Sequence, residues 1–227
     1  MFEKRYMAIL ADTEESKSIH YALRHQVYCQ EKGFLDSSDI ALETDRFDTD
    51  AVHFLVRDLL KSKWVGTLRV ILPKQNGLPM MQIIGDDLLR DKGLLLNKVA
   101  EISRLSIISQ HRNKISVVNE HSFSEVMFSL VSAAKHYCES LGIDTWVFLC
   151  RKSLSKIANR QGMAMNKIGG PYEYKGDRYP YVVNLDDAFT GLEKISNKLH
   201  KLLHSHQSFQ RYSEFLYKPP SAEIRQG

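Results

Sequence analysis

The stretch Glu101-Ile102-Ser103-Arg104-Leu105 lies within an apolar segment, residues 99–108, whose composition is typical of a β-strand. Glu101 and Arg104 are therefore expected beside the core, where a charged side chain needs a counterion or a chemical role. Side chains alternate along a regular strand, so these two would point to opposite faces unless a β-bulge brought them together. The sequence leaves both arrangements open.

Further charged residues lie in or beside apolar segments earlier in the chain. Arg24 begins the block R-H-Q-V-Y-C-Q-E-K-G-F-L, Asp45 and Asp48 lie in E-T-D-R-F-D, and Arg69 ends G-T-L-R. Several carboxylates and guanidinium groups placed in this way indicate one polar cluster in an otherwise apolar site.

These blocks resemble those of the acyl-homoserine-lactone synthase type of acyltransferase. They are still more similar to those of its relatives, the N-acyl amino acid synthases and the acyltransferases associated with exosortase (PEP-CTERM) systems. The pattern of that last group is R-x-x-V-Y-C-x-E-x-G-F-L, E-T-D-x-F-D, V-H, V-G-T-x-R-x-x-L-P and A-E-I-S-R-L. It is matched in order by residues 24–35, 43–48, 52–53, 65–73 and 100–105. Several spaced blocks in a fixed order are more specific than any single motif, and the resemblance ends near residue 115.

The composition is that of a soluble globular protein with one main core. The chain has 227 residues, of which 43% are hydrophobic and 26% charged, enough for one core with at most a small appendage. No apolar run reaches the length of a membrane span, and the first residues lack the apolar region of a secretory signal, so we expect a cytoplasmic protein. A net charge of +4 does not indicate a nucleic-acid partner, and three cysteines without C-x-x-C spacing indicate neither a disulfide framework nor a zinc site.

Hydrophobic periodicity alone predicts a mixed domain of helices and strands. The expected strands are at 6–11, 52–57, 64–72, 99–108 and 145–150, with a final hairpin at 165–168 and 179–185. A first helix is expected to be capped by Asp12 or Thr13 and to end near Gly33, and two more helices are expected at 122–140 and 153–160. Their order matches the GCN5-related N-acetyltransferase (GNAT) plan. The resemblance implies the same fold: α+β, with a mixed central sheet flanked by helices.

We expect an acyltransferase domain at 1–186 and a basic helical extension and tail at 187–227. The lysines and histidines of the extension predict either a solvated helix face or a docking surface for an acidic partner. His200, His204 and His206 have helical spacing but no carboxylate to complete a metal site, so we predict no metal. His53, in an alternating strand, either orients a carboxylate or fills core space.

Amide formation from a thioester requires a neutral amine, a polarised carbonyl and a channel for the acyl chain. A carboxylate, or a water molecule held by one, must take the proton of the incoming ammonium group. Glu101 is the first candidate base, with Asp45 and Asp48 as alternatives that could instead bind the ammonium. Glu101 could also be a purely structural ion-pair partner of Arg104 or Arg69. Ser103 could donate a hydrogen bond to the acyl carbonyl or the acceptor, and backbone amides of the same strand could stabilise an oxyanion.

The resemblance assigns further roles residue by residue. Eight positions match those of the residues that the lactone synthases share, with departures at two of them, Tyr28 and Phe34: Arg24, Tyr28, Phe34, Asp45, Asp48, Arg69, Glu101 and Arg104. Glu101 and Arg104 are expected to be catalytic, together with Ser103 for its hydroxyl group, and the other six of these residues are expected to bind the acceptor. Phe34 replaces a tryptophan and Tyr28 a phenylalanine that help to shape the S-adenosylmethionine pocket of those synthases. This difference favours another amine as the acceptor.

The segment Gln110-His111-Arg112-Asn113-Lys114 occupies the place where acetyltransferases keep a glycine-rich pyrophosphate loop, and it contains no glycine. Its sequence favours acyl carrier protein over coenzyme A as the donor, with Arg112 and Lys114 near the phosphopantetheine; a solvated turn is the alternative. The chain is thus predicted to transfer a fatty acyl group to a small amine, most simply an amino acid. The alternatives are a lactone synthase that uses S-adenosylmethionine and a non-catalytic acyl-binding module of an exopolysaccharide or exosortase system.

Overall fold

The computed structural model describes residues 5–36, 40–72, 77–112, 117–204 and 209–217, with only the backbone of 117–121. Within these residues one mixed sheet has the strand order β6-β8-β5-β4-β3-β2-β1-β9, and β7 pairs with β8. Only the β4–β5 and β1–β9 pairs in this described part are parallel. The strands are β1 (Tyr6–Leu10), β2 (Ala51–Asp58), β3 (Lys63–Ile71), β4 (Val99–Ile107), β5 (Thr145–Cys150), β6 (Asn166–Lys167), β7 (Tyr172–Glu173), β8 (Asp177–Asn184) and β9 (Phe209–Arg211).

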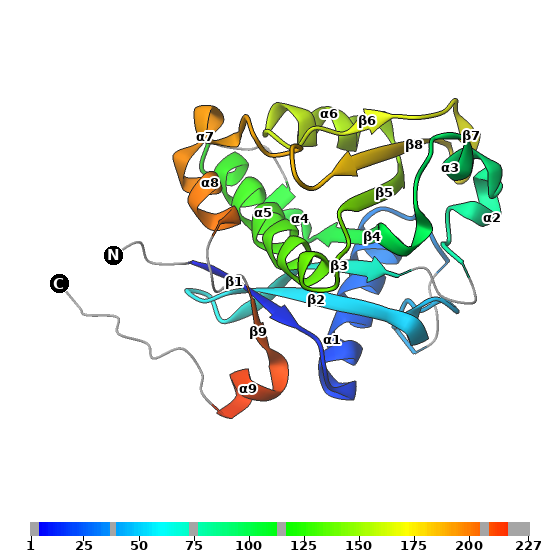
Figure 1. Ribbon diagram of the computed structural model, residues 1–227. Helices are drawn as coiled ribbons and strands as arrows, with labels where there is room; N and C mark the ends of the chain where they lie inside the picture. The colour runs from blue at the N-terminus through cyan, green and yellow to red at the C-terminus, as the bar shows by residue number, and fades with distance from the viewer. Residues whose placement is uncertain (1–4, 37–39, 73–76, 113–116, 205–208, 218–227) are drawn as a thin grey trace.

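Helices cover both faces of the sheet. In Figure 1, α5 (Val117–Ser140) crosses the front of the sheet and α1 (Glu14–His25) lies behind it. The other helices are α2 (Met81–Ile84), α3 (Asp87–Asp91), α4 (Ser109–Arg112), α6 (Lys152–Arg160), α7 (Leu192–Ile195), α8 (Asn197–Leu203) and α9 (Tyr212–Tyr217). No helix in the described ranges is both long and apolar enough to cross a membrane.

The first helix begins and ends as sequence rules predict, with one irregularity. Thr13 caps it through a reciprocal capping box with Ser16. After His25 the helix continues as a π-helical segment, Gln26–Glu31, and Gly33 follows with a φ of +59°. π-Helical turns are frequent at functional sites, and this one carries Tyr28 toward β4.

Gly66 lets β3 approach the end of β4 and helix α5. A Cβ at this position would lie 3.0 Å from the carbonyl oxygen of Ser106 and 3.1 Å from the side chain of Val126. The glycine of the G-T-L-R block therefore has a packing role.

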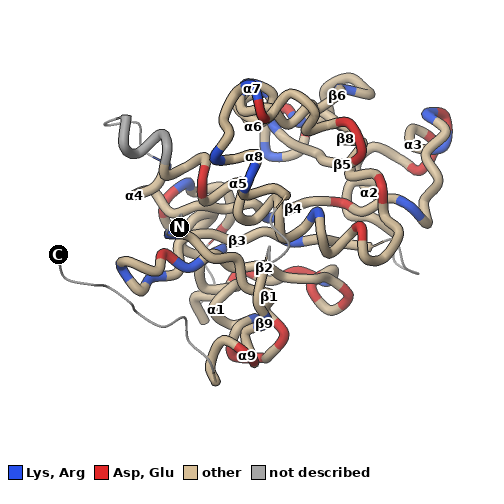
Figure 2. Tube along the Cα trace, turned by 60° about the vertical axis from the view of Figure 1, so that its left-hand side comes forward, with Lys and Arg blue, Asp and Glu red and all other residues tan. Residues whose placement is uncertain are grey.

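The C-terminal extension is more varied than the single basic helix predicted for it. It contains α7, α8, β9 and α9, and its Leu192, Leu199, Leu203 and Tyr212 belong to the main apolar core. Strand β9 extends the central sheet by pairing with β1. Figure 2 shows basic positions on α7 and α8 beside acidic ones, and Lys198 pairs with Glu125 of α5 at 2.6 Å. The division at residue 186 stays a prediction about folding units, although both parts share one core.

Candidate active site

Strands β4 and β5 separate and leave a cleft between them. Their pairing runs from Val99–Thr145 to Glu101–Val147, although β4 continues to Ile107 and β5 to Cys150. A cavity of about 670 Å³ follows this separation, which is within the usual size of a small-molecule site. Apolar side chains form much of its wall: Phe47, Met80, Ile83, Ile102, Leu105, Ile107, Phe123, Phe148, Leu149, Leu154 and Ile157.

Three arginines and three carboxylates form one ion-pair network beside the cavity. Arg24 binds Glu43 and, at 2.6 Å, Asp48. Arg69 binds Asp45 and Asp48, each at 2.7 Å. Arg104 binds Glu43 and Asp45, each at 2.8 Å. The charges of these six residues balance, which explains how Arg24 and Arg69 can be almost completely buried.

The pKa values of the three carboxylates reflect this pairing. Burial by itself would raise them, but the hydrogen bonds and charges of the neighbouring arginines outweigh it, so the pKa of Glu43, Asp45 and Asp48 is lowered. These groups therefore stay ionised at neutral pH. The alternative in which Asp45 or Asp48 acts as the base is disfavoured, because a paired carboxylate of low pKa is a weak base.

A β-bulge settles which way Arg104 points. Arg69 pairs with Ser103 but Thr67 pairs with Ser106, so β4 contains one extra residue here. Arg104 has a φ of +50°, a rare conformation for an L-residue with a side chain. The Thr67 hydroxyl donates to the carbonyl of Arg104, and the Tyr28 hydroxyl donates to that of Leu105, both at 3.0 Å. The bulge thereby lets Glu101, Ser103 and Arg104 all line the same cavity.

Glu101 differs from the other carboxylates because it lacks a counterion. Among the described residues it forms no ion pair, and its Oε2 accepts a hydrogen bond of 2.8 Å from the backbone N–H of Met80. Its arginine neighbours pair with Glu43, Asp45 and Asp48, so the structural alternative of an ion pair with Arg104 or Arg69 is wrong. Burial raises the pKa of Glu101 to about 7. A carboxylate of this pKa at the point where the strands part is well suited to act as a general base at neutral pH.

Ser103 and His53 hold parts of the site in place. The Ser103 oxygen accepts a hydrogen bond of 3.0 Å from Arg69 Nε, which leaves its hydroxyl hydrogen available to another group. His53 Nε2 lies 3.2 Å from the backbone oxygen of Asp48, and the His53 ring packs 4.6 Å from that of His20. Burial lowers the pKa of His53 to about 4, so this residue is a neutral support for the loop that carries Asp48.

The structure brings nearly all the predicted site residues together. Phe34 and Tyr28 line the cavity with Glu101, and the Tyr28 hydroxyl supports the bulge. Arg112 also lines the cavity and pairs with Glu31, whereas Lys114 lies outside the described residues.

The predicted site missed Glu43 and Lys32. Glu43 joins Arg24 to Arg104, and its place at the start of E-T-D-R-F-D was the available signal. Lys32 lines the cavity from the end of the π-helical segment. Its position within the first block offered a signal only through its neighbours Tyr28 and Phe34.

Comparison with known proteins agrees with this geometry. A family model described as an acetyltransferase (GNAT) domain matches residues 23–119, which include the whole ion-pair network and Glu101. The acyl-homoserine-lactone synthase of Vibrio anguillarum is 22% identical over 147 residues, which are 65% of this chain and 73% of that protein.

Solved structures with a similar fold include two kinds of synthase. The AHL synthase LasI superposes with a TM-score of 0.64 at 18% identity over 83% of this chain and 94% of LasI. FeeM, an N-acyl amino acid synthase from uncultured soil microbes, superposes with a TM-score of 0.60 at 15% identity over 85% of this chain and 99% of FeeM. BjaI, a CoA-dependent acyl-homoserine lactone synthase, gives 0.62 at 17% identity over 86% and 89% of the two chains.

These findings confirm the predicted α+β GNAT-like fold and the prediction that the chain is an acyltransferase enzyme. The predicted similarity to lactone synthases is confirmed in sequence and fold, and the similarity to N-acyl amino acid synthases is confirmed in fold. The association with exosortase systems stays a prediction.

Proposed function

We propose that the protein transfers a fatty acyl group from a phosphopantetheine thioester to the amine of a small acceptor, most simply an amino acid, and so forms an N-acyl amide. The observation that carries this proposal is Glu101, a buried carboxylate that has no ion-pair partner among the described residues and a pKa of about 7. It lies at the vertex of the cleft, which is the point where β4 and β5 separate. In this position it can accept the proton of the acceptor's ammonium group at neutral pH.

The reaction then follows from the residues around the vertex. The neutral amine attacks the thioester carbonyl, a C–N bond forms, and the C–S bond breaks as the donor's thiol leaves with a proton. The Ser103 hydroxyl and the backbone N–H groups of β4 that lack a β5 partner can donate to the carbonyl oxygen as it gains negative charge. Arg69 and Arg104 lie beside them as permanently charged guanidinium groups paired with Asp45, so they hold the geometry of the site and transfer no proton.

The shape of the cavity supports a fatty acyl donor. Its wall is rich in aliphatic and aromatic side chains, and burying a methylene group in such surroundings is worth about 0.8 kcal/mol. The absence of glycine in residues 110–114 supports acyl carrier protein as the donor, and we propose Arg112 and Lys114 as part of its binding surface.

The acceptor is proposed to be an amine other than S-adenosylmethionine. The tryptophan expected at residue 34 by resemblance to the lactone synthases is replaced by phenylalanine, and the Tyr28 hydroxyl is engaged with the Leu105 carbonyl. A lactone synthase remains the second candidate, because a protein similar in sequence to this chain, from Vibrio anguillarum, is one.

A single assay separates the two candidates. Purified protein is incubated with long-chain acyl carrier protein and mixed amino acids, with and without S-adenosylmethionine, and the products are identified by mass spectrometry. We expect N-acyl amino acids in both incubations, formed at least about a hundredfold more slowly with Glu101→Gln. An acyl-homoserine lactone formed only when S-adenosylmethionine is present would establish the second candidate, and no acyl transfer from any donor would refute both.

A further inference from the structure

The wide end of the cleft gathers positive charges from several elements. Lys32 follows the π-helical segment, Arg112 ends α4, Arg151 precedes α6, and Arg178 lies in β8; all four line the cavity. In the described part of the chain, only Arg112 has a carboxylate partner, Glu31. Among the described residues, Lys32, Arg151 and Arg178 therefore form no ion pair, although the charges of Glu31 and Glu173 act on Lys32 and Arg178.

Lys32 and Arg151 converge on one aromatic ring. The Nζ of Lys32 lies 5.4 Å from the centre of the Phe34 ring, and the guanidinium carbon of Arg151 lies 4.6 Å from it. Nη1 of Arg178 donates to the carbonyl oxygens of Gly176 and Asp177 at 3.1 and 3.3 Å, next to the turn whose Lys175 carbonyl accepts from Arg151 at 3.4 Å. The positive groups are thus positioned by ring and backbone contacts rather than by opposite charges.

The closeness of these positive charges shifts the pKa values of their side chains. Burial, together with the charges of Arg112, Arg151 and Arg178, lowers the pKa of Lys32 to about 8, although Glu31 acts in the opposite direction. Burial and the charge of Arg151 also lower the pKa of Arg178. Nε of Arg112 is buried without a hydrogen-bond acceptor. A bound anion would relieve all of these unfavourable features.

The length of the cleft indicates which anion fits. Val147 pairs with Glu101, and Arg151 lies four residues farther along the same extended chain, a distance of roughly 13 Å. The pantetheine arm has about thirteen bonds between its thioester sulfur and its phosphorus, or roughly 15 Å at the ~1.2 Å per bond of an extended chain. A thioester at Glu101 would therefore place the phosphate of the arm among the positive charges.

Resting on the proposed function, we propose that Lys32, Arg151 and Arg178 form a side-chain site for the phosphate group of the donor's phosphopantetheine arm. The site replaces the backbone amides of a glycine-rich loop, which residues 110–114 do not supply. It recognises the phosphate common to acyl carrier protein and coenzyme A, and it distinguishes both from simple thioesters.

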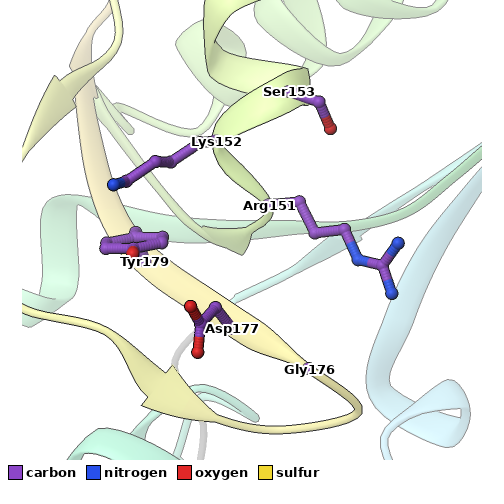
Figure 3. Close-up of a pocket in the computed structure, with 6 residues that line it drawn as sticks. All are labelled: Arg151, Lys152, Ser153, Gly176, Asp177 and Tyr179. Atoms are coloured by element: carbon purple, nitrogen blue, oxygen red, sulfur yellow. The ribbon is translucent and has the colours of Figure 1, made fainter.

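Lys152 provides a matched control, because it is a neighbouring cation that points elsewhere. Figure 3 shows Lys152 directed toward Tyr179 and Arg151 directed away from it. The Nζ of Lys152 lies 4.5 Å from the Tyr179 ring centre, and Lys152 does not line the cleft cavity. Lys152→Ala removes one positive charge, as Lys32→Ala does, but changes no residue that lines the cavity.

The test compares two donors that differ only by the phosphate: an acyl-phosphopantetheine and the same acyl-pantetheine. We expect the wild-type enzyme to have a KM at least about tenfold lower for the phosphorylated donor, as a charge-assisted hydrogen bond allows. Lys32→Ala and Arg151→Ala should use both donors alike, Lys32→Arg should restore most of the preference, and Lys152→Ala should keep it. Equal KM values for the two donors in the wild type would overturn the proposal, as would variants that keep the preference.

Two further measurements separate this inference from the proposed function. Calorimetric titration with phosphopantetheine alone needs no turnover, so binding that is lost in Lys32→Ala but kept in Lys152→Ala supports the site even if no amide is formed. If Lys32→Ala instead raises the KM for the amino acid and leaves the donor preference intact, the positive charges bind the acceptor's carboxylate and the phosphate proposal is wrong.

Discussion

The charged groups around the cavity form two regions that differ in whether each charge has a counterion. In the ion-pair network, Arg24, Arg69 and Arg104 share three carboxylates, and the pKa of each carboxylate is lowered. At the two ends of the cleft, Glu101 and Lys32 have no ion-pair partner among the described residues. Their pKa values move toward neutrality, to about 7 and about 8.

This difference separates structural charges from reactive ones. A paired, buried charge cannot change its protonation state near pH 7 without leaving its partner uncompensated. An unpaired one can, because burial already disfavours its charged form. The network therefore fixes the geometry of the site, while Glu101 and Lys32 are free to exchange a proton or to bind a charged ligand.

The largest expected effect comes from removing the basic oxygen at the vertex. Glu101→Gln keeps the size of the side chain and an acceptor for Met80, so it should lower kcat by roughly two to four orders of magnitude without reducing the free energy of unfolding. Steady-state kinetics and denaturant unfolding measure the two quantities. A variant with near-native turnover would show that Glu101 is structural.

Disrupting the ion-pair network should mainly reduce the stability of the fold. Asp48 Oδ1 accepts from Nη1 of both Arg24 and Arg69, so Asp48→Asn leaves two buried guanidinium groups short of a counterion. We expect the free energy of unfolding to fall by about 3–5 kcal/mol. Asp91→Asn, at an exposed carboxylate of α3, is the control and should change it by less than about 0.5 kcal/mol. A loss below 1 kcal/mol for Asp48→Asn would mean that the network is not what stabilises this region.

The pH dependence of activity should report both unpaired groups. The base must be deprotonated, so kcat/KM should rise about tenfold per pH unit below the Glu101 pKa of about 7 and then level off. Lys32 loses its positive charge above its pKa of about 8, so kcat/KM for a phosphorylated donor should fall again in that range. In Lys32→Arg the fall should disappear and the rise should remain. A profile that is flat between pH 5 and pH 7 would rule out Glu101 as the titrating base.

The smallest expected effect concerns the donor surface. The double change Arg112→Glu, Lys114→Glu should raise the KM for acyl carrier protein several-fold with little change in kcat, and should weaken the salt dependence of binding, because it reverses charges that steer an acidic partner. Lys194→Glu, on α7, tests the alternative surface on the C-terminal extension. If only that variant raises the KM, the carrier protein docks there.

Local patterns were sufficient for most of the fold. Strands β2, β3, β4 and β5 lie within a residue or two of their predicted bounds, because each has the length and the apolar pattern typical of a strand. The short helices α2 and α3 were missed, since four or five residues do not show a helical period. Strand β9 was missed for a similar reason: its three residues form a strand only by pairing with β1, which lies about 200 positions earlier.

The sequence by itself determined which groups could make this site: the carboxylates and arginines of the first half, Glu101 in an apolar strand, and the absence of glycine after it. Their residue types and order are local properties, and they limit the chemistry. Only the tertiary structure decided how the charges are shared. The bulge at Arg104 turns its side chain to the network, and long-range contacts give every network arginine a carboxylate, while Glu101 and Lys32 receive no ion-pair partner in the described part of the chain. Pairing depends on distances between residues far apart in the chain, and those distances set the pKa values that assign a structural or a reactive role to each charge.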